Sequence, residues 1–342
     1  MQEFNLINKF FKPLNTNKTL SRNLSDDTSS IHLKNSQELI ISKDIFVENI
    51  HFKLSDGARN IASKLLATNL SDIASSGAKP YGYMLGIGKT SNLDEKFFSE
   101  FCLGLKDLQK KFHLDLIGGD TVNSKIFFLS ITIFGITKKN KILSRQNAKS
   151  TDLIFVSGTI GDAGLGLKLL AENKLSKNID HKFLINRHLQ PTPQIKLGNE
   201  LLNLKLSKCA IDVSDGLLAD VKKICESSKL DAKIYLDKIP FSKQAKKFLK
   251  ENDHHNPLDL LGSGDDYELV FSVNNKDLSK INLLAKKLKI NLTCIGEFIK
   301  NNKNNNFQIF LLEEINNHDK LTKTNKNNYK LIKNFKLGYE HS

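Results

Sequence analysis

Aspartates that recur in short stretches of small residues are the side chains of this sequence best suited to chemistry. Five such stretches lie near a turn, a glycine or a strand end: Ser25-Asp26-Asp27, Ser42-Lys43-Asp44, Asn69-Leu70-Ser71-Asp72, Gly118-Gly119-Asp120-Thr121 and Asp212-Val213-Ser214-Asp215-Gly216. Hard divalent cations take oxygen ligands, and Mg²⁺ bound together with phosphates needs only one or two carboxylates per ion. The pattern therefore predicts several Mg²⁺ ions clustered around a nucleoside triphosphate.

The composition is typical of a soluble globular protein. The chain has 342 residues, of which 39% are hydrophobic and 26% charged, and this length favours two domains. No stretch reaches the roughly 18 apolar residues that a membrane span needs, and the first residues lack the basic-then-apolar order of a signal peptide. The four cysteines lie far apart without a C-x-x-C pair, which argues for reduced thiols. We therefore expect a cytoplasmic protein with no membrane partner.

The net charge of +14 allows two interpretations. A basic surface could bind nucleic acid or anionic lipid. Alternatively, the Lys- and Asn-rich stretches at residues 301–306 and 323–328 are solvated loops of drifted composition, since no aromatic interleaving or binding motif accompanies the lysines. We favour the second interpretation and expect no nucleic-acid partner, although positive charge would help to collect anionic substrates.

Hydrophobic periodicity places the N-terminal acidic stretches at the ends of strands and helices. A strand over residues 39–41 runs into Ser42-Lys43-Asp44, and a helix over residues 59–75 carries Asp72 near its last turn. A carboxylate is unfavourable there because the negative end of the helix dipole is close, and a bound cation would remove that conflict. The other expected elements are an amphipathic helix over residues 4–14, a helix over 93–112, a strand over 114–117 that breaks at Gly118-Gly119, and a long strand over 126–136.

The composition shifts at residues 147–151, so we place a domain boundary there and expect domains of residues 1–148 and 149–342. The second half restarts with a strand over 153–157 and a glycine-rich loop over 158–166. This loop lacks the Gly-Lys-Ser/Thr end of a P-loop and the third glycine of the dinucleotide fingerprint, so a plain strand-to-helix turn is favoured over a phosphate site. Further on, we expect a strand that ends at Asp212, a helix that opens at Gly216 and a strand over 267–273.

Taken in chain order, these stretches resemble the thiamine-monophosphate kinase family, which belongs to the superfamily of aminoimidazole-ribonucleotide synthetase. The likeness spans nearly the whole chain, and the order and spacing of its segments are specific although each segment alone is weak. The segments are Glu3-Phe4-x-Leu6-Ile7, Ser25-Asp26-Asp27, His51-Phe52, the run from Asn69 to Pro80, Leu116-Ile117-Gly118-Gly119-Asp120-Thr121, Arg187-His188-Leu189-x-Pro191, the run from Ile211 to Leu217, Gly264-Asp265-Asp266-Tyr267-Glu268-Leu269 and Gly338-Tyr339-Glu340-His341.

The resemblance implies an α/β (α+β) fold of two domains, similar to aminoimidazole-ribonucleotide synthetase. An N-terminal sheet domain would form a homodimer, and a C-terminal α/β domain would close over the active site. The implied activity is the ATP-dependent phosphorylation of thiamine monophosphate to thiamine diphosphate. Several Mg²⁺ ions would be the cofactor, and ATP would be the co-substrate.

The resemblance also implies three sets of site residues. The metal positions are Asp27, Ser42, Lys43, Asp44, Asp72, Asp120, Asp212 and Asp215, of which Asp72, Asp120, Asp212 and Asp215 are the expected catalytic residues. The nucleotide positions are Gly119, Asp120, Arg145 and Ser214. The positions that contact thiamine monophosphate are His51, Asp265 and one aromatic residue near the C-terminus, Phe335 or Tyr339.

The composition of this set suits the implied chemistry. A phosphate monoester with a second pKa of about 6 is largely dianionic at neutral pH, so the acceptor needs no general base. The difficulty is to bring two polyanions together, and positioning with metal neutralisation is the main contribution expected. Many aspartates without a nucleophile–base pair are the residues that this task requires.

The sequence departs from the family pattern at several positions. Ser25 replaces a glycine, Lys43 a threonine and Asp265 a glutamate, and the chain ends in Glu-His-Ser where Asp-His-Phe is usual. If the family residue at position 43 binds metal through its backbone carbonyl, the lysine is tolerated. If its hydroxyl binds, the lysine ammonium displaces one Mg²⁺ and substitutes its charge.

Rival interpretations stay open. An aminoimidazole-ribonucleotide synthetase-like ligase would also use ATP and Mg²⁺ but would accept a formylglycinamidine ribonucleotide. A basic nucleic-acid-binding protein would show strongly salt-dependent binding. A kinase altered at Lys43 and Asp265 would bind its ligands without turnover. Selenophosphate synthetase is disfavoured because no cysteine or glycine-rich segment lies near the N-terminus.

Overall fold

The chain folds into two compact units. The computed structural model describes residues 3–16, 28, 31–172, 178–252, 256–301, 306–314, 329–332 and 335–338. The first unit consists of Met1–Ile142 together with Leu189–Ile195, and the second of Leu143–His188 together with Lys196–Ser342. The domain boundary expected after residue 148 does not include the return of Leu189–Ile195 to the first unit. The division into functional domains at that boundary stays a prediction.

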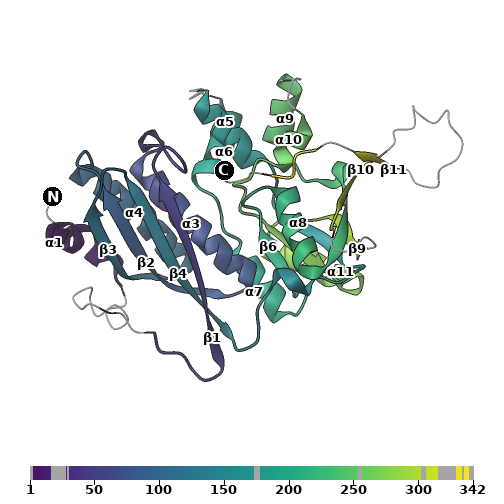
Figure 1. Cartoon of the computed structure of the whole chain (residues 1–342), viewed down its shortest axis with the longest axis horizontal. Coiled ribbons are helices and arrows are strands. Elements are labelled where there is room, and N and C mark those ends of the chain that lie inside the picture. The colour runs from purple at the N-terminus through teal and green to yellow at the C-terminus, as the bar shows by residue number, and fades with distance from the viewer. Residues whose placement is uncertain are drawn as a thin grey trace, which may run out of the picture. The chain divides into compact units, whose positions relative to one another are not determined.

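The first unit is a β-sheet with helices on one face (Figure 1). Within the described residues its strands lie in the order β1-β4-β2-β3. Strands β2 and β3 are parallel, and the other neighbours are antiparallel. The elements are α1 Glu3–Leu6, the π-helical turn η1 Ile7–Phe11, η2 Lys12–Leu14, β1 Gln37–Val47, η4 Leu54–Asp56, α3 Ala58–Ser76, β2 Lys79–Lys89, α4 Glu95–Phe112, β3 Asp115–Asn123 and β4 Phe128–Lys138.

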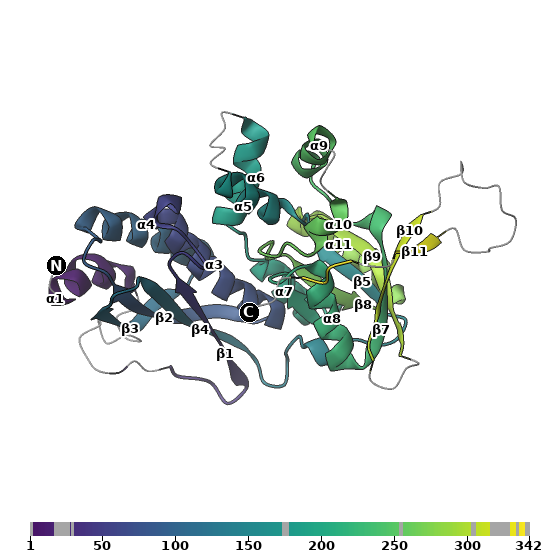
Figure 2. The same ribbon diagram turned by 45° about the horizontal axis from the view of Figure 1, so that its top comes forward.

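The two faces of this sheet have different surroundings. Helices α3 and α4 lie together on one face, as Figure 2 shows, and that face buries Ile131 and Ile133 of β4 completely. Successive side chains of a strand point to opposite faces. The other face carries apolar side chains that are exposed in the single chain, including Ile41 at 58% and Ile45 at 52%. An apolar sheet face of this kind is a surface that favours association.

The structure contains the strands and helices expected for the first half, with three differences. The strand expected over 39–41 is β1 Gln37–Val47, so Ser42-Lys43-Asp44 lies within the strand instead of after it. The strand expected to break at Gly118-Gly119 continues to Asn123. A Cβ atom on Gly119 would lie 2.1 Å from the carbonyl oxygen of Leu85, so the glycine permits close pairing with β2 instead of ending the strand. Strand β2 itself was not foreseen, because Pro80 and several glycines interrupt its pattern of β-forming residues.

The second unit is built on a larger mixed sheet. Within the described residues its strands lie in the order β11-β10-β7-β9-β5-β8-β6. Its elements are η5 Arg145–Asn147, β5 Leu153–Ser157, α5 Asp162–Ala171, α6 Ile179–Leu189, α7 Ile195–Asn203, β6 Ala210–Asp212, α8 Leu217–Ser228, β7 Leu230–Tyr235, η6 Leu236–Lys238, α9 Lys243–Glu251, α10 Pro257–Leu261, β8 Leu269–Val273, η7 Asn275–Asp277, α11 Leu278–Leu288, β9 Leu292–Lys300, β10 Ile309–Glu314 and β11 Tyr329–Ile332.

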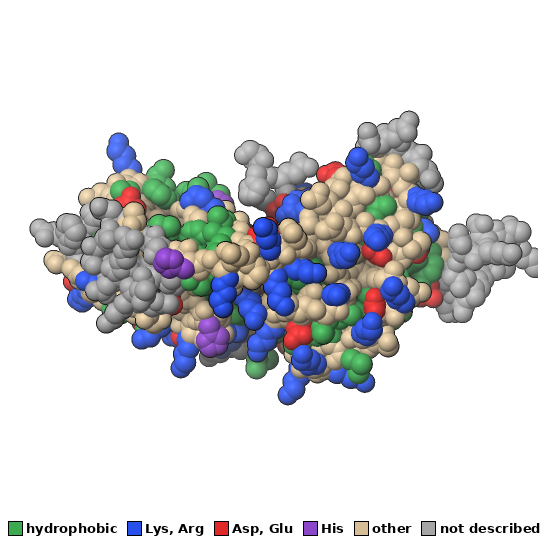
Figure 3. Space-filling view, turned by 90° about the horizontal axis from the view of Figure 1, so that it is seen from below, with side chains coloured by type: hydrophobic (Ala, Val, Ile, Leu, Met, Phe, Trp, Pro, Cys, Tyr) green, Lys and Arg blue, Asp and Glu red, His purple; other side chains and the backbone are tan. Residues whose placement is uncertain are grey.

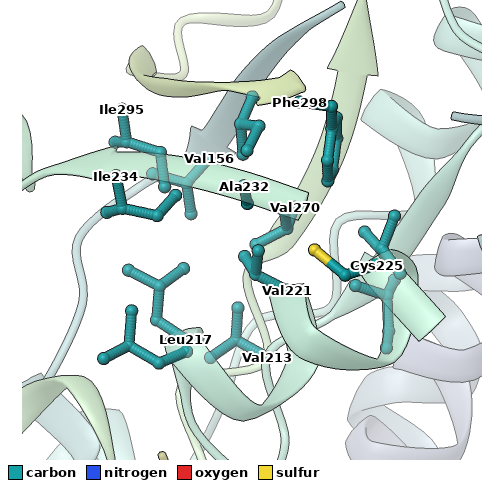
Figure 4. Close-up of a cluster of buried hydrophobic side chains, with 14 of the residues drawn as sticks. Val156, Val213, Leu217, Val221, Cys225, Ala232, Ile234, Val270, Ile295 and Phe298 are labelled. Carbon is teal, nitrogen blue, oxygen red and sulfur yellow. The ribbon is translucent and has the colours of Figure 1, made fainter. Parts of the chain in front are cut away.

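One hydrophobic cluster joins helix α8 to this sheet. Figure 4 shows Leu217, Val221 and Cys225, which recur every four residues along α8, beside Val156 and Val270 of the strands. Burial raises the pKa of the Cys225 thiol to about 12, so this thiol stays protonated at neutral pH and serves packing. The cluster fixes the start of α8 and therefore the loop that precedes it.

The surface is rich in basic side chains. Figure 3 shows Lys and Arg spread over the face in view, with Asp and Glu among them. The excess of positive charge is therefore not confined to the Lys- and Asn-rich C-terminal stretches. Among the described residues, no helix combines the length and the apolar content that a membrane crossing requires.

Candidate functional site

A cluster of hydroxyl and carboxylate oxygens lies between β1 and α3 in the first unit. Ser42 and Asp44 are two residues apart on β1 and so share one face of the strand. Thr68 and Asp72 are four residues apart on α3 and so share one face of the helix. Ser42 Oγ donates to Asp72 Oδ2 at 2.5 Å. Thr68 Oγ1 lies 3.2 Å from Asp44 Oδ2 and 3.0 Å from the carbonyl oxygen of Leu65, and its one hydrogen is shared between these two acceptors. The structure therefore brings together the predicted residues Ser42, Asp44 and Asp72.

The first cluster (Ser42, Asp44, Thr68 and Asp72) has the donor atoms that Mg²⁺ prefers. Both carboxylates are half-buried, and oxygen ligands suit a hard cation. Asp72 lies near the C-terminal end of α3, which stops at Gly77, and the helix dipole favours a cation there. Among the described residues, no three His, Cys, Asp or Glu side chains lie close enough to hold a metal by themselves. The residues fit a cation whose remaining ligands are phosphate oxygens and water.

The side chain of Lys43 lies on the opposite face of the sheet. It sits between Ser42 and Asp44 in β1, and strand alternation turns it away from them. Its ammonium donates to Ser130 Oγ of β4 at 2.7 Å. The lysine charge is therefore not placed beside the two carboxylates of the first cluster.

Asp120 shares the face of Lys43. It lies opposite Gly86 of β2, which in turn lies opposite Ser130 of β4. Its exposed carboxylate accepts a hydrogen bond from the backbone N–H of Thr121 at 2.8 Å. Strands β1 and β3 are the two edges of the sheet. Within one copy of the chain, Asp120 and Asp44 are thus separated by edge and by face.

His51 closes a tight turn after β1. Its Nδ1 accepts a hydrogen bond from the Val47 N–H at 3.1 Å, and its ring stacks on Phe46 with centroids 5.5 Å apart. Asn49 adopts a left-handed backbone with φ of 64°, which allows the chain to reverse here. The structure gives His51 a structural task in this turn, and its contact with a substrate stays a prediction.

In the second unit, strand β6 delivers the loop Asp212–Gly216. Asp212 is buried, whereas Ser214 and Asp215 are half-buried. Gly216 has φ of 125°, and a Cβ atom there would lie 2.9 Å from the carbonyl oxygen of Leu261. Only glycine fits this position. The turn it makes starts α8, as the sequence predicted.

Two side chains that the sequence analysis missed hold this loop. Asp220 Oδ2 accepts the backbone N–H groups of Ser214 and Asp215 at 3.0 and 3.1 Å. Lys223 Nζ donates to Asp220 Oδ1 at 2.7 Å and to Asp215 Oδ2 at 2.5 Å. An acid in the first turn of α8, followed three residues later by a lysine, was the available signal because helix N-termini favour carboxylates.

A second loop runs beside Asp212–Gly216 and carries Asp265. The Asp265 N–H donates to the carbonyl of Ser214 at 2.9 Å. Tyr267 OH donates to Oδ1 of its carboxylate at 3.0 Å, and His188 Nδ1 lies 3.4 Å from Oδ2. The structure therefore joins Asp265, Ser214 and their neighbours in one group within the second unit.

The glycine-rich loop 158–166 is occupied by the protein's own carboxylate. Asp266 accepts the N–H groups of Gly161 at 2.6 Å and Ala163 at 3.2 Å at the start of α5. Burial raises the pKa of Asp266 to about 7, although these hydrogen bonds and the charge of Arg187 lower it in part. The arrangement agrees with the prediction of a plain strand-to-helix turn.

The last described segment, residues 335–338, lies against the start of α8. Phe335 packs on the hydrophobic cluster of the second unit. A Cβ atom on Gly338 would lie 2.6 Å from the carbonyl oxygen of Asp215, so the chain passes directly beside that loop. Tyr339 follows Gly338 in sequence and lies outside the described residues.

Two predicted site residues remain, Arg145 and Asp27. Arg145 lies in η5 with its side chain exposed. Its carbonyl oxygen accepts a hydrogen bond from Ser228 Oγ at 2.6 Å, so the backbone is anchored while the guanidinium faces solvent. Asp27 lies outside the described residues.

Comparisons with known proteins agree with these features. Residues 25–137 match the family AIR synthase related protein, N-terminal domain, and residues 149–305 match AIR synthase related protein, C-terminal domain. The thiamine-monophosphate kinase of Buchnera aphidicola subsp. Schizaphis graminum is 38% identical over 296 residues, which cover 86% of this chain and 90% of that protein.

Solved structures give the same relationship. The thiamine-monophosphate kinase of Stenotrophomonas maltophilia K279a has a TM-score of 0.81 and 31% identity, covering 91% of this chain and 96% of that one. The structure of AaThiL complexed with AMPPCP and TMP has a TM-score of 0.74 and 26% identity, covering 90% and 93%. The chain belongs to the thiamine-monophosphate kinase family, within the AIR synthase related proteins.

Proposed function

We propose that this protein transfers the γ-phosphoryl group of ATP to thiamine monophosphate and so forms thiamine diphosphate. The observation that carries the proposal is the first cluster, where the Ser42 and Thr68 hydroxyls lie within hydrogen-bonding distance of the carboxylates of Asp72 and Asp44. A relative of the same fold binds AMPPCP and TMP together, which are an ATP analogue and the acceptor of this reaction.

The electrostatics of the reaction explain the choice of residues. The acceptor phosphate is already anionic, so its approach to ATP is opposed by charge and not by a proton. Mg²⁺ held by Asp44 and Asp72 would neutralise the phosphate oxygens and stabilise the charge of the transferred group. Ser42 fixes the orientation of the Asp72 carboxylate by donating to its Oδ2. In the second unit, the proposed nucleotide contact Ser214 is held by its backbone hydrogen bond to Asp220.

The acceptor would be bound by the second unit through Asp265. Tyr267 fixes the Asp265 carboxylate, and the Asp265 backbone is bonded to Ser214. The carboxylate can therefore accept a hydrogen bond from the acceptor substrate without a free-energy cost for reorientation. Because Phe335 packs on the hydrophobic cluster, we assign the stacking role on the cationic thiazolium to Tyr339, whose neighbour Gly338 lies beside Asp215.

The test is product formation by purified protein with Mg-ATP and two alternative acceptors. Thiamine monophosphate should yield thiamine diphosphate, and a formylglycinamidine ribonucleotide should yield no ADP above background. ADP formation that depends on the ribonucleotide would replace the kinase by a synthetase-like ligase. Omission of either substrate controls for ATP hydrolysis.

We also propose that the protein acts as a homodimer through the open face of the first unit's sheet. That face carries Ile41 and Ile45 more than half exposed, and Met84 and Val122 also lie exposed on it. Two copies that pack these faces together would bury the apolar side chains, as stable dimer interfaces do. In a two-fold pair with its axis along the strands, the β1 edge of one copy lies over the β3 edge of its partner.

This dimer would complete the metal-binding set. In one copy Asp120 lies on the β3 edge and on the open face, away from Asp44 on the β1 edge. Across the dimer, the partner's Asp120 would come from the adjacent edge. We therefore propose that Asp120 serves the site of the other subunit.

Mixing two inactive variants tests this arrangement. Asp44→Asn and Asp120→Asn should each be inactive, but subunits exchanged in a 1:1 mixture should recover roughly a quarter of wild-type turnover, because half of a random set of two-fold dimers then contain one intact site. No recovery after verified subunit exchange would place Asp44 and Asp120 in the same subunit's site. A monomer by sedimentation would remove the dimer proposal.

A further inference from the structure

Lys223 is a cation that the protein itself supplies to the second unit's acidic loop. Its ammonium lies between two carboxylates, 2.5 Å from Asp215 Oδ2 and 2.7 Å from Asp220 Oδ1. The Asp220 side chain is fully buried, while the side chains of Asp215 and Lys223 are 29% and 32% exposed. The lysine is therefore held in a defined place at the boundary between core and solvent.

The two carboxylates have different tasks. Asp220 uses its second oxygen to accept the backbone N–H groups of Ser214 and Asp215, so it is committed to holding the loop. Burial raises the pKa of Asp220, which its interactions with Lys223 oppose. Asp215, by contrast, is partly exposed, and it is one of the metal positions that the family resemblance implies and that we propose together with the kinase function.

A single carboxylate oxygen cannot serve both cations fully. Lys223 occupies Asp215 Oδ2 at hydrogen-bonding distance, and an ammonium at that place repels a second cation. Burial by itself would lower the pKa of Lys223, but its hydrogen bonds to Asp215 and Asp220 outweigh burial and raise the pKa. The lysine therefore stays charged at neutral pH and keeps its hold on the carboxylate.

We infer that Lys223 competes with divalent cations for Asp215 and so sets a lower metal affinity at the acidic loop of the second unit. The inference rests on the proposed function for the role of Asp215, but it concerns binding and not turnover. In physical terms, the positive charge of Lys223 lies beside a carboxylate that would bind a metal ion more tightly without it.

The experiment is a titration of the nucleotide-free protein with Mn²⁺, in which free Mn²⁺ is measured by electron paramagnetic resonance. Lys223→Gln can still donate hydrogen bonds to both carboxylates but lacks the charge, and Lys223→Met also removes the donors. Each should bind Mn²⁺ at least about tenfold more tightly than the wild type at one site, a change of ~1.4 kcal/mol. Lys223→Arg keeps the charge and should resemble the wild type.

A matched control comes from the same helix. Lys222 is the next residue of α8, and its ammonium donates to the carbonyl of Phe307 instead of to Asp215. Lys222→Met changes the net charge by the same amount and should leave Mn²⁺ affinity unchanged. The double variant Asp215→Asn/Lys223→Gln should not show the tighter Mn²⁺ binding, because it lacks the carboxylate for which Lys223 competes with the metal ion.

Unchanged or weaker Mn²⁺ binding by folded Lys223→Gln would overturn the inference, as would an equal gain in Lys222→Met. Urea denaturation confirms that each variant is folded before titration. Thiamine diphosphate formation by the wild type is measured separately. A wild type without kinase activity, in which Lys223→Gln nevertheless tightens Mn²⁺ binding, would contradict the proposed function and leave this inference standing.

Discussion

The acidic clusters of the two units are held in different ways. In the first unit, the Ser42 hydroxyl donates to Asp72, and the Thr68 hydroxyl lies within hydrogen-bonding distance of Asp44. In the second unit, an ammonium donates to Asp215. A hydroxyl orients a carboxylate and leaves its negative charge available, whereas an ammonium neutralises it. If the proposed metal sites are correct, we expect the first cluster to bind a divalent cation more tightly than the acidic loop of the second unit.

Removing a charge from the first cluster tests this difference between the two units most directly. Asp44→Asn should lower turnover by at least ~10³-fold, because the loss of an electrostatic contact to the transferred group costs roughly 4 kcal/mol. Ser42→Ala, which removes an orienting hydroxyl and no charge, should cost only about tenfold. Steady-state formation of thiamine diphosphate measures both. Near-normal turnover in folded Asp44→Asn would refute the assignment of the first cluster.

In the second unit, the largest effect should be on stability. Asp220→Asn leaves Lys223 with one carboxylate and presents an amide to the backbone N–H groups of Ser214 and Asp215. Breaking a buried charge pair of this kind costs roughly 3 kcal/mol of unfolding free energy. Urea denaturation measures the loss, with Lys222→Met as a control expected to change by less than about 0.5 kcal/mol. An Asp220→Asn protein as stable as the control would show that the pair does not hold the loop.

The pH dependence of stability should depend on Asp266. Its pKa is raised from 3.8 to about 7 by burial, so the folded state binds more protons than the unfolded state between these values. Stability is full below about pH 4 and falls as pH rises through about 7, with a loss of roughly 2–3 kcal/mol between about pH 5 and about pH 8 from this group. Asp266→Asn should flatten that part of the profile in urea denaturation at several pH values. A variant profile parallel to the wild type would exclude Asp266 as its source.

The smallest effect is expected at the turn after β1. His51→Phe keeps the stacking on Phe46 but loses the acceptor for the Val47 N–H, which should cost about 1 kcal/mol of unfolding free energy. If His51 also contacts the acceptor, the apparent KM for thiamine monophosphate should rise more than the KM for ATP. A rise confined to ATP would contradict the substrate role and leave only the structural one.

Much of the fold could be predicted from sequence because most of its elements have simple patterns. Helix α3 was expected over 59–75 from its apolar face and is Ala58–Ser76, and strand β5 was expected over 153–157 and is Leu153–Ser157. Strand β2 escaped notice because Pro80 and glycines replace the usual β-branched residues. At least one of those glycines has a tertiary cause, because a side chain of the neighbouring strand leaves no room for a Cβ atom. Phe128, for example, would lie 2.0 Å from a Cβ on Gly88.

The site was predictable as a set of residue types but not as an arrangement. Ser42, Asp44 and Asp72 form one cluster because the face of β1 that carries Ser42 and Asp44 packs against the face of α3 that carries Asp72. Asp120 looked equivalent in sequence, but the register of β3 places it on the other face. The spacing of Asp220 and Lys223 in the first turns of α8 was only a weak signal, because their importance comes from the burial of Asp220 beneath the loop, and burial is a tertiary property.

The central claim is that the first cluster supports metal-dependent phosphoryl transfer to thiamine monophosphate. The most direct measurement is thiamine diphosphate formation from Mg-ATP and thiamine monophosphate by the wild type and by Asp72→Asn, each confirmed to be folded. We expect product with the wild type, none after EDTA treatment, and at least a ~10³-fold loss in the variant. No product with the folded wild type, or near-normal turnover in Asp72→Asn, would contradict it.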